Sequence, residues 1–311
     1  MMSINSEHAR DKKVVLLTGA SSGLGLTLAK KLIKEKRYFL ILTCREASCF
    51  RFHSEKIHED KDVWIRNLNV IDHKQVKSVI DEINSKLGGV DILINNAGIS
   101  ERSTVEDSDD ICRQRQLDVN YLAPFELIGQ VLPSMREKKW GRVINISSAS
   151  GFMAMPTMSS YSASKSALES ASESLWYEMK PWDIGVTLIV PGFIKSLSYL
   201  NTRETGQSEY CARNRSSPYY EHYKNMKELI AKQMSSSYST NEKVADKIIN
   251  SLTDKTPPLR LHVGIDSWLF FLFRKIFPTK LYHFTLYNSL PNIKKWGRGD
   301  FHKRTDTQLM Q

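Results

Sequence analysis

The sequence predicts an α/β protein with a single doubly wound parallel sheet, helices on both faces of the sheet and a C-terminal extension. Short apolar runs rich in β-branched residues alternate with stretches whose apolar residues recur at helical spacing. Such alternation is typical of crossover units in a parallel sheet. A glycine-rich turn follows the first run, and polar or glycine residues follow several later ones. Because ligands of such sheets bind beyond the carboxyl ends of the strands, we expect these residues to share one crevice.

The first strand, turn and helix form the best-defined unit. The apolar run 14–17 leads into Gly19, Gly23 and Gly25, and apolar residues at helical spacing follow. Glycine permits a sharp turn and lets a phosphate approach the N–H groups at the start of a helix, where the dipole favours an anion. No Gly-Lys-Ser/Thr follows, which disfavours the phosphate loop of a nucleotidase. An ordinary glycine-rich turn is the alternative.

Five more strands are expected, at 39–43, 63–70, 91–95, 143–147 and 185–190. Helices are expected at 74–87, 118–135, 161–179 and 218–234, and a last one after a capping box of Ser239 and Glu242. Residues 201–217 are polar without periodicity, which predicts a mobile loop. We expect one domain over residues 1–255 and a basic, aromatic-rich extension over 256–311.

Charge and cysteine usage narrow the class of protein. The net charge is +10, and residues 256–311 hold nine Lys or Arg against three Asp. No zinc finger, basic zipper or RNA-binding signature accompanies this charge, so no nucleic-acid partner is predicted. Residues 1–13 are polar and lack the pattern of a signal peptide, which predicts a cytoplasmic protein. The four cysteines lack metal-ligand spacing, so we expect reduced thiols and no metal site.

Tyr161 and Lys165 stand four residues apart on a predicted helix and therefore share a face. A free tyrosine has a pKa of about 10, and a neighbouring cation favours the phenolate, so we expect Lys165 to lower the pKa of Tyr161. Ser148 ends a predicted strand at the crevice, where its hydroxyl is suited to a carbonyl oxygen that gains negative charge. A solvated helix pair and a serine-rich turn are the alternatives.

Six motifs occur in one order: Thr18-Gly19-Ala20-Ser21-Ser22-Gly23-Leu24-Gly25, Asn95-Asn96-Ala97-Gly98, Asn120, Ser148, Tyr161-x-x-x-Lys165 and Pro191-Gly192. In order and spacing they resemble the short-chain dehydrogenase/reductase family over roughly residues 13–255. The resemblance implies a Rossmann fold, a nicotinamide cofactor and hydride transfer between the nicotinamide and a carbinol or carbonyl carbon. It also implies a homodimer through the helices that contain Asn120 and Tyr161.

The resemblance assigns roles to four catalytic side chains. Tyr161 is the acid/base and Lys165 holds the nicotinamide ribose. Ser148 orients the substrate carbonyl, and Asn120 maintains a water-linked proton path. Besides Tyr161 and Lys165, the implied cofactor contacts are Gly19, Ser21, Ser22, Gly23, Leu24, Gly25, Arg45, Asn69, Val70, Asn96, Ala97, Gly98, Pro191, Gly192, Ile194 and Ser196. Asn69 and Ser196 replace the family's usual Asp and Thr, and each keeps a side chain able to make the same contact.

Arg45 decides the expected form of the cofactor. An enzyme that binds NAD usually offers a carboxylate at the end of the second strand, whereas this chain has Cys44 followed by a guanidinium suited to a 2′-phosphate. The sequence therefore predicts NADP(H). A surface Arg45 paired with Glu46 is the alternative.

Within the family, the chain looks most like the subgroup containing estradiol 17β-dehydrogenase type one and the photoreceptor retinol dehydrogenase. This likeness rests on the helical segment 218–234, the run 256–260 and Cys44-Arg45 at the end of the second strand. This likeness implies a steroid, retinoid or other lipid-like alcohol or ketone. We expect Ser148, Met155, Phe193 and Tyr220 to contact this substrate, since methionine and aromatic side chains form deformable apolar pockets. The steroid-binding relative has a histidine near Tyr220, so steroid specificity is unsupported.

Residues 265–282 combine an apolar run, Trp268 to Phe273, with Arg274 and Lys275. The run is too short to span a bilayer, which takes about 20 residues. Aromatic and basic residues together are typical of an interfacial helix, which predicts peripheral membrane contact. A lid or a dimer-packing helix is the alternative.

The sequence thus favours an NADP(H)-dependent oxidoreductase that interconverts a hydrophobic alcohol and its carbonyl. Two alternatives stay open: a 3-oxoacyl or general carbonyl reductase, and a non-catalytic dinucleotide-binding scaffold or sensor. The complete set of four catalytic side chains argues against a sensor.

Overall fold

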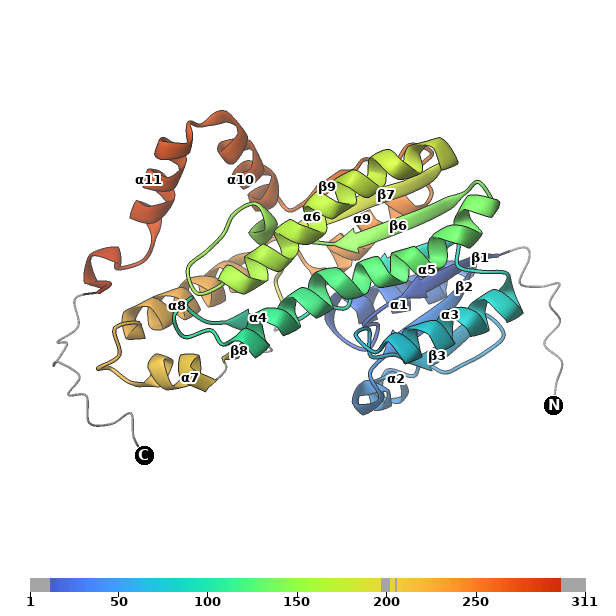
Figure 1. Ribbon diagram of the computed structural model, residues 1–311, viewed down its shortest axis with the longest axis horizontal. Coiled ribbons are helices and arrows are strands. Elements are labelled where there is room, and N and C mark those ends of the chain that lie inside the picture. Colours follow the sequence, from blue (N-terminus) through green and yellow to red (C-terminus); the bar gives the residue numbers. More distant parts are fainter. Residues whose placement is uncertain (1–11, 197–201, 205, 298–311) are drawn as a thin grey trace.

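The computed structural model describes residues 12–196, 202–204 and 206–297, and a parallel sheet dominates them (Figure 1). Seven strands of the described chain form this sheet in the order β3-β2-β1-β4-β6-β7-β9. They are β1 Lys13–Leu17, β2 Tyr38–Cys44, β3 Val63–Asn67, β4 Ile92–Asn95, β6 Gly141–Ile146, β7 Ile184–Pro191 and β9 Arg260–Val263. Every pairing is parallel. The strand order reverses between β1 and β4, which opens a crevice at their carboxyl ends.

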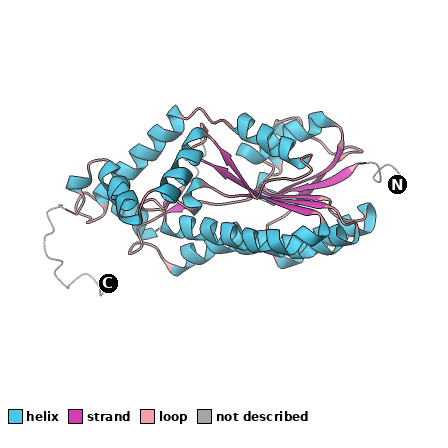
Figure 2. Ribbon diagram, turned by 90° about the horizontal axis from the view of Figure 1, so that it is seen from above, coloured by secondary structure: helices cyan, strands magenta, loops and turns pink. Residues whose placement is uncertain are grey.

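Helices cover both faces of the sheet (Figure 2). Their bounds are α1 Gly23–Glu35, α2 Phe50–Ser54, α3 His73–Leu87, α4 Asp110–Leu117, α5 Ala123–Glu137, α6 Ser159–Met179, α7 Gly206–Arg213, α8 Tyr220–Ser236, α9 Asn241–Leu252, α10 Ile265–Ile276 and α11 Thr279–Ser289. A two-stranded sheet joins β5 Glu101–Arg102 to β8 Arg203–Glu204. The carboxyl ends of the strands face the end of the molecule where α8 and α10 lie (Figure 1). The predicted fold class is confirmed.

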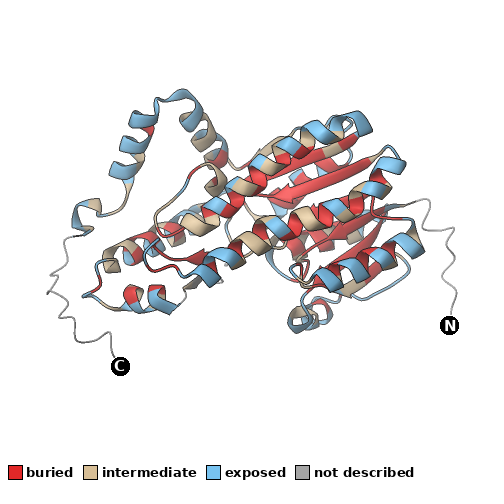
Figure 3. Ribbon diagram, viewed as in Figure 1, coloured by how far each residue is buried: buried red, intermediate tan, exposed pale blue. Residues whose placement is uncertain are grey.

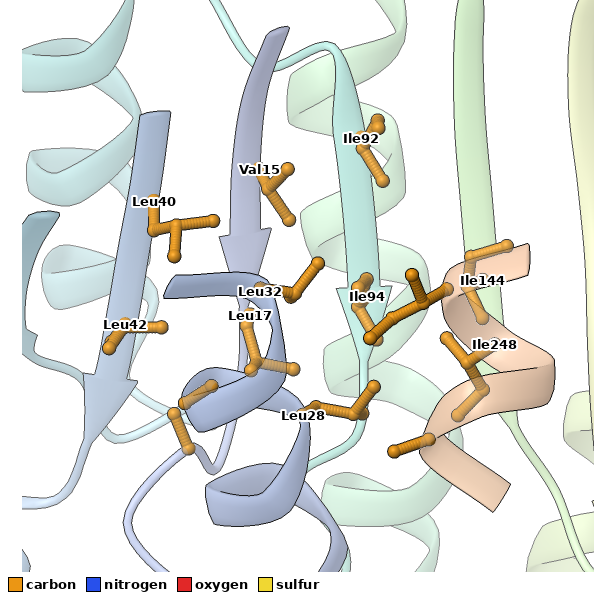
Figure 4. Packing of buried hydrophobic residues seen from close by; sticks show 14 of the residues in the cluster. Val15, Leu17, Leu28, Leu32, Leu40, Leu42, Ile92, Ile94, Ile144 and Ile248 are labelled. Carbon is orange, nitrogen blue, oxygen red and sulfur yellow. The ribbon is translucent and has the colours of Figure 1, made fainter. Parts of the chain in front are cut away.

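Two apolar clusters, one on each face, hold the layers together. Alternate strand residues such as Val15 and Leu17 pack against α1 and α9 (Figure 4), and their neighbours Val14 and Leu16 pack with α3 and α5. The strands are buried while the outer surfaces of the helices are exposed (Figure 3). Because helices cover both faces of the sheet, β2, Tyr38–Cys44, is buried along its whole length, and Thr43 is its one polar residue apart from the Tyr38 hydroxyl.

Six strands were expected, and the seventh, β9, comes from the segment expected to be an extension. Arg260–Val263 pairs with β7 at the edge of the sheet. Its four residues alternate between charged or polar and apolar, and only Val263 is buried. An edge strand needs no continuous apolar run, so its pattern does not distinguish it from a loop. The sheet thus depends on a segment beyond residue 255.

Three local expectations need correction. β3 ends at Asn67 rather than at residue 70. The cap of α9 is Thr240, not Ser239, because the Thr240 side chain accepts from the Lys243 amide at 3.4 Å. Part of the loop expected over 201–217 is helical, as α7. Positions 201 and 205 of that loop lie outside the described residues.

Candidate active site

The glycine turn between β1 and α1 lies at the switch point of the sheet. Gly19 and Gly23 have φ values of +65° and +54°, a conformation that favours glycine. A Cβ on Gly19 would lie 2.9 Å from the Ala97 Cα, and one on Gly25 would overlap the carbonyl oxygen of Gly19. The turn is therefore built so that backbone, rather than side chains, lines the crevice.

The start of α1 is open toward that crevice. Its N-cap, Ser22, makes no side-chain capping bond, and the first turn, which includes Leu24, has no acidic residue. Ser21 is buried beside the turn while Ser22 and Gly23 are exposed. Helix N-terminal amides bind phosphate. The arrangement fits the phosphates of a dinucleotide.

The segment after β4, residues 96–98, is hydrogen-bonded to the start of the glycine turn. The amides of Asn96 and Ala97 both donate to the Thr18 hydroxyl at 3.0 Å. The Asn96 side chain donates to the carbonyl oxygens of Thr18 and Gly19 at 2.9 and 3.1 Å. The structure thus joins the first two motifs into one wall of the crevice.

A hollow of about 420 Å³ lies beyond β2, lined by Arg45, Glu46, Ala47, Asn67, Asn69 and Gln75. Arg45 is exposed and makes no ion pair with any described residue, so the expected alternative of an Arg45–Glu46 pair is not formed. The Gln75 side-chain oxygen accepts from the Asn69 amide at 2.8 Å and so fixes the segment that follows β3. Val70, the next residue of this segment, is buried. A free guanidinium in a hollow fits an anionic group of a ligand.

Ser148 and Tyr161 meet at the carboxyl end of β6. Ser148 follows that strand, and its oxygen accepts from the Ser150 amide at 3.1 Å. Tyr161 lies in the first turn of α6. Burial raises the pKa of Tyr161, and a hydrogen bond with the Ser148 side chain partly offsets that rise. A raised pKa keeps the phenol protonated near neutral pH, as a proton donor requires.

Lys165 corrects an expectation. Its Nζ lies 5.9 Å from the centroid of the Tyr161 ring and donates to the Ile146 carbonyl oxygen at 2.8 Å. The pKa of Tyr161 is not lowered as expected, because burial, the largest influence on it, raises it. Burial also lowers the pKa of Lys165 itself, to about 8. A Cβ on Gly98 would lie 3.8 Å from the same Nζ, which places Lys165 beside the segment after β4.

Asn120 occupies a π-helical turn, Asp118–Leu122, between α4 and α5. Its side-chain oxygen accepts from the Ile99 amide at 2.9 Å, and its nitrogen donates to the Ile99 carbonyl at 2.9 Å and to the Ser164 hydroxyl at 3.0 Å. The buried amide thus joins the segment after β4 to α6. The helix was expected to begin at 118, whereas α4 starts it at Asp110 and the π turn interrupts it. Such turns are frequent at functional sites.

The family model described as short chain dehydrogenase matches residues 13–206, which include all of these side chains. The chain belongs to the short-chain dehydrogenase family. It is 36% identical over 197 residues to dehydrogenase/reductase SDR family member 7B of Xenopus laevis, covering 60% of each chain. It is also 36% identical over 187 residues to 11-beta-hydroxysteroid dehydrogenase A of Sesamum indicum, covering 59% of this chain and 53% of the relative. The chain thus matches little more than half the length of these relatives.

A solved short-chain dehydrogenase from Streptomyces avermitilis has the same fold. It superposes with a TM-score of 0.73 at 27% identity, over 89% of this chain and 96% of that one.

In this short-chain dehydrogenase the loop after β7 is held by a residue that the sequence did not single out. Pro191 is buried and ends β7, and the Gly192 amide donates to the Val263 carbonyl at 3.0 Å. The Asp266 carboxylate accepts from the Phe193 amide at 2.6 Å, and a Cβ on Gly192 would overlap that carboxylate. Gly192 therefore makes room for Asp266.

Four more of the expected contacts lie in the segment after β7, before α6 or at the start of α8. Ile194 packs partly buried against the core, and Ser196 is half-buried. Met155 is half-buried in the turn before α6, and Tyr220 is the first residue of α8. Their roles in cofactor or substrate binding stay predictions.

Glu169, one helical turn beyond Lys165, was also missed. Its carboxylate is buried, accepts from the Ser147 hydroxyl at 2.7 Å and lies 3.6 Å from Arg260 Nε. It raises the pKa of Lys165, opposing the effect of burial. The Asp72-x-x-Gln75 spacing is a sequence signal for Gln75, because Asp72 caps α3 and accepts from the Gln75 amide at 3.1 Å and from the Gln75 side-chain nitrogen at 3.0 Å. Glu169 has no such sequence signal, because its neighbours in the sequence are those of a surface residue on a helix.

Proposed function

We propose that the protein is an NADP(H)-dependent oxidoreductase that interconverts a hydrophobic alcohol and its carbonyl compound, working as a reductase. The observation that carries the proposal is the meeting of Tyr161 with Ser148 and Lys165 at the sheet edge that also holds the open glycine turn. The glycine turn would hold the phosphates of a dinucleotide, and these three side chains would act at its nicotinamide end.

The chain's own groups supply the proton chemistry. In reduction the Tyr161 hydroxyl donates its proton to the carbonyl oxygen, and in oxidation the phenolate takes it back. The Ser148 hydroxyl hydrogen-bonds the same oxygen as negative charge develops there. The nicotinamide, when bound, supplies or accepts the hydride. Lys165 keeps a positive charge near the ring, and Asn120 holds α6 in register with the segment after β4.

Arg45 supports NADP(H) as the form of the cofactor. The guanidinium lines a hollow with Asn69 and has no ion-pair partner among the described residues. A 2′-phosphate would provide one. Glu46 lines the same hollow, so the charge of its lining is mixed.

Three observations support a steroid, retinoid or lipid-like substrate. The Phe193 amide is held by Asp266 next to Pro191-Gly192, and Met155 lies half-buried before α6. The Sesamum relative is named as a hydroxysteroid dehydrogenase. The likeness to the estradiol and retinol dehydrogenase subgroup remains part of this proposal.

A substrate panel tests the proposal. Purified protein is assayed with NADPH and with NADH against a ketosteroid, retinaldehyde, a long-chain aliphatic ketone and a 3-oxoacyl thioester. We expect turnover of at least one of the first three compounds with NADPH. Exclusive turnover of the thioester would favour the 3-oxoacyl reductase alternative, and no turnover by a protein that binds NADPH would favour a sensor.

We also propose a homodimer through α5 and α6. Tyr177 on α6 and Leu122 beside α5 are 68% and 48% exposed, which leaves apolar side chains for an interface. Light scattering during size-exclusion chromatography is expected to give twice the chain mass of 35.7 kDa. A monomer would contradict this part of the proposal.

A further inference from the structure

Two C-terminal helices form an exposed apolar surface. We call α10 and α11, residues 265–289, the C-terminal arm. The arm projects from the body of the molecule and is mostly exposed (Figures 1 and 3). Six of its large apolar side chains are between 45% and 67% exposed: Trp268, Leu269, Ile276, Leu281, Phe284 and Tyr287. Large apolar side chains that are exposed in this number on one segment are typical of an interaction site.

The same surface contains a hollow. A cavity of about 340 Å³ lies along α10, and every residue that lines it, from Leu269 to Phe277, is apolar. A hollow lined in this way suits an acyl chain rather than a polar ligand.

Basic residues surround the apolar side chains. Arg274 and Lys275 lie in the last turn of α10 and Lys280 lies in the first turn of α11, and all three are exposed. Lys294 and Lys295 follow α11. The one acidic residue in 265–297 is Asp266, whose carboxylate is turned inward to the Phe193 amide. The exposed charge of the arm is therefore uniformly positive, which complements anionic lipid headgroups.

We propose that the C-terminal arm docks on the surface of a membrane that carries anionic lipids, with its apolar side chains in the interface and its basic residues at the headgroups. Apolar area and positive charge act together in such binding. No helix in the described parts of the chain is long and apolar enough to cross a bilayer. The arm accordingly lies along the surface.

The arm is firmly joined to the candidate active site. The Ser267 hydroxyl donates to the Val190 carbonyl at 2.7 Å, and the rings of Phe271 and Phe152 lie 5.8 Å apart. Phe152 follows the short turn that Ser148 begins. Docking therefore brings the crevice close to the membrane, where an apolar substrate is dissolved; this last step rests on the proposed function.

Vesicle co-sedimentation of the full chain tests the docking without substrate or cofactor, so its outcome is independent of the enzymatic proposal. Phosphatidylcholine vesicles are compared with vesicles that also contain phosphatidylserine, at low and at high salt. We expect binding to the anionic vesicles that weakens several-fold as salt is raised.

Paired variants locate the contact. Phe284→Ser is expected to lower the bound fraction, whereas Phe50→Ser, a similarly exposed phenylalanine on α2, is expected to leave it unchanged. The double variant Arg274→Glu/Lys275→Glu is expected to weaken binding at least about 25-fold, since each basic residue near an anionic surface contributes about fivefold. Lys34→Glu/Lys139→Glu, both exposed on the body, is its control.

Three outcomes overturn the proposal. One is the absence of sedimentation with anionic vesicles at low salt. Another is binding that neither arm variant alters. The third is a vesicle-independent change in molar mass of Phe284→Ser, which would assign the surface to a second copy of the chain.

Discussion

The carboxylate of Asp266, on α10, accepts a 2.6 Å hydrogen bond from the backbone amide of Phe193, just beyond the end of β7. The two residues come from segments 73 positions apart. Through this contact the C-terminal segment holds the Pro191-Gly192 loop, which the family resemblance assigns to the cofactor. The chain beyond residue 255 is thus tied both to the sheet, through β9, and to the site.

Asp266→Ala leaves the Phe193 amide without its partner. An unsatisfied, partly buried donor costs about 1–3 kcal/mol, so we expect a lower free energy of unfolding and weaker NADPH binding. Urea unfolding and fluorescence titration measure the two effects. Asp266→Asn keeps an acceptor and is expected to lose less in both. Equal NADPH affinity in Asp266→Ala and the unmodified protein would contradict the role given to this contact.

Gly25→Ala is expected to abolish dinucleotide binding, because its Cβ would overlap the Gly19 carbonyl and press on the Asn96 side chain. Gly129→Ala is the matched control. Gly129 lies within α5, and a Cβ there meets nothing within 4 Å, so this variant should be up to about 1 kcal/mol more stable. Titration with NADPH and thermal unfolding separate the two variants. Normal binding by Gly25→Ala would contradict the geometry of the turn.

Arg45→Ala tests the form of the cofactor. A charge-assisted hydrogen bond contributes about 1.5–3 kcal/mol, so KM for NADPH should rise about 10-fold to 100-fold while KM for NADH changes little. Steady-state kinetics with both cofactors measure this. Arg51→Ala, on the neighbouring α2, controls for general loss of positive charge. Equal changes for both cofactors would refute the assignment of a 2′-phosphate to Arg45.

Glu169→Gln tests the electrostatics of Lys165. The Lys165 ammonium favours the negative charge that Tyr161 gains on giving up its proton, so reduction should slow as pH rises through about 8, the pKa of Lys165. Removing the Glu169 charge lowers the pKa of Lys165 further, and the decline should then begin at lower pH. The profile of kcat/KM against pH measures the shift. Glu173→Gln, the next carboxylate along α6 that contacts Arg260, should leave the profile unchanged, and an unshifted profile in Glu169→Gln would count against this account.

The sequence predicts most of the sheet because both faces of its central strands are buried. β1 is apolar after Lys13 and β2 is apolar except at Thr43, and each strand is followed by the turn residues that the crevice needs. The apolar pattern does not predict β9, because Arg260 and His262 give this segment the composition of a loop. Only its pairing with β7 makes it a strand. The π turn at Asn120 likewise depends on tertiary hydrogen bonds to Ile99 and Ser164, which no local pattern encodes.

The residues of the candidate site likewise fall into two groups, those that the sequence predicts and those that it does not. Glycine positions, the Ser148 turn and the Tyr161–Lys165 spacing are local features, and motifs reveal them. Residues that act through long-range contacts, such as Asp266 and Glu169, are visible only once the chain is folded. The direction of the Tyr161 pKa shift belongs to this second group, because it depends on burial, which spacing does not report.

Tyr161→Phe tests the central claim most directly, since it removes one hydroxyl and keeps the ring. With a substrate found in the panel, kcat should fall by at least about 100-fold, the usual contribution of a positioned general acid. The dissociation constant of NADPH, measured by fluorescence titration, should stay within about twofold of the unmodified protein. A variant that binds NADPH normally and keeps its full kcat would contradict the assignment of Tyr161 as the proton donor.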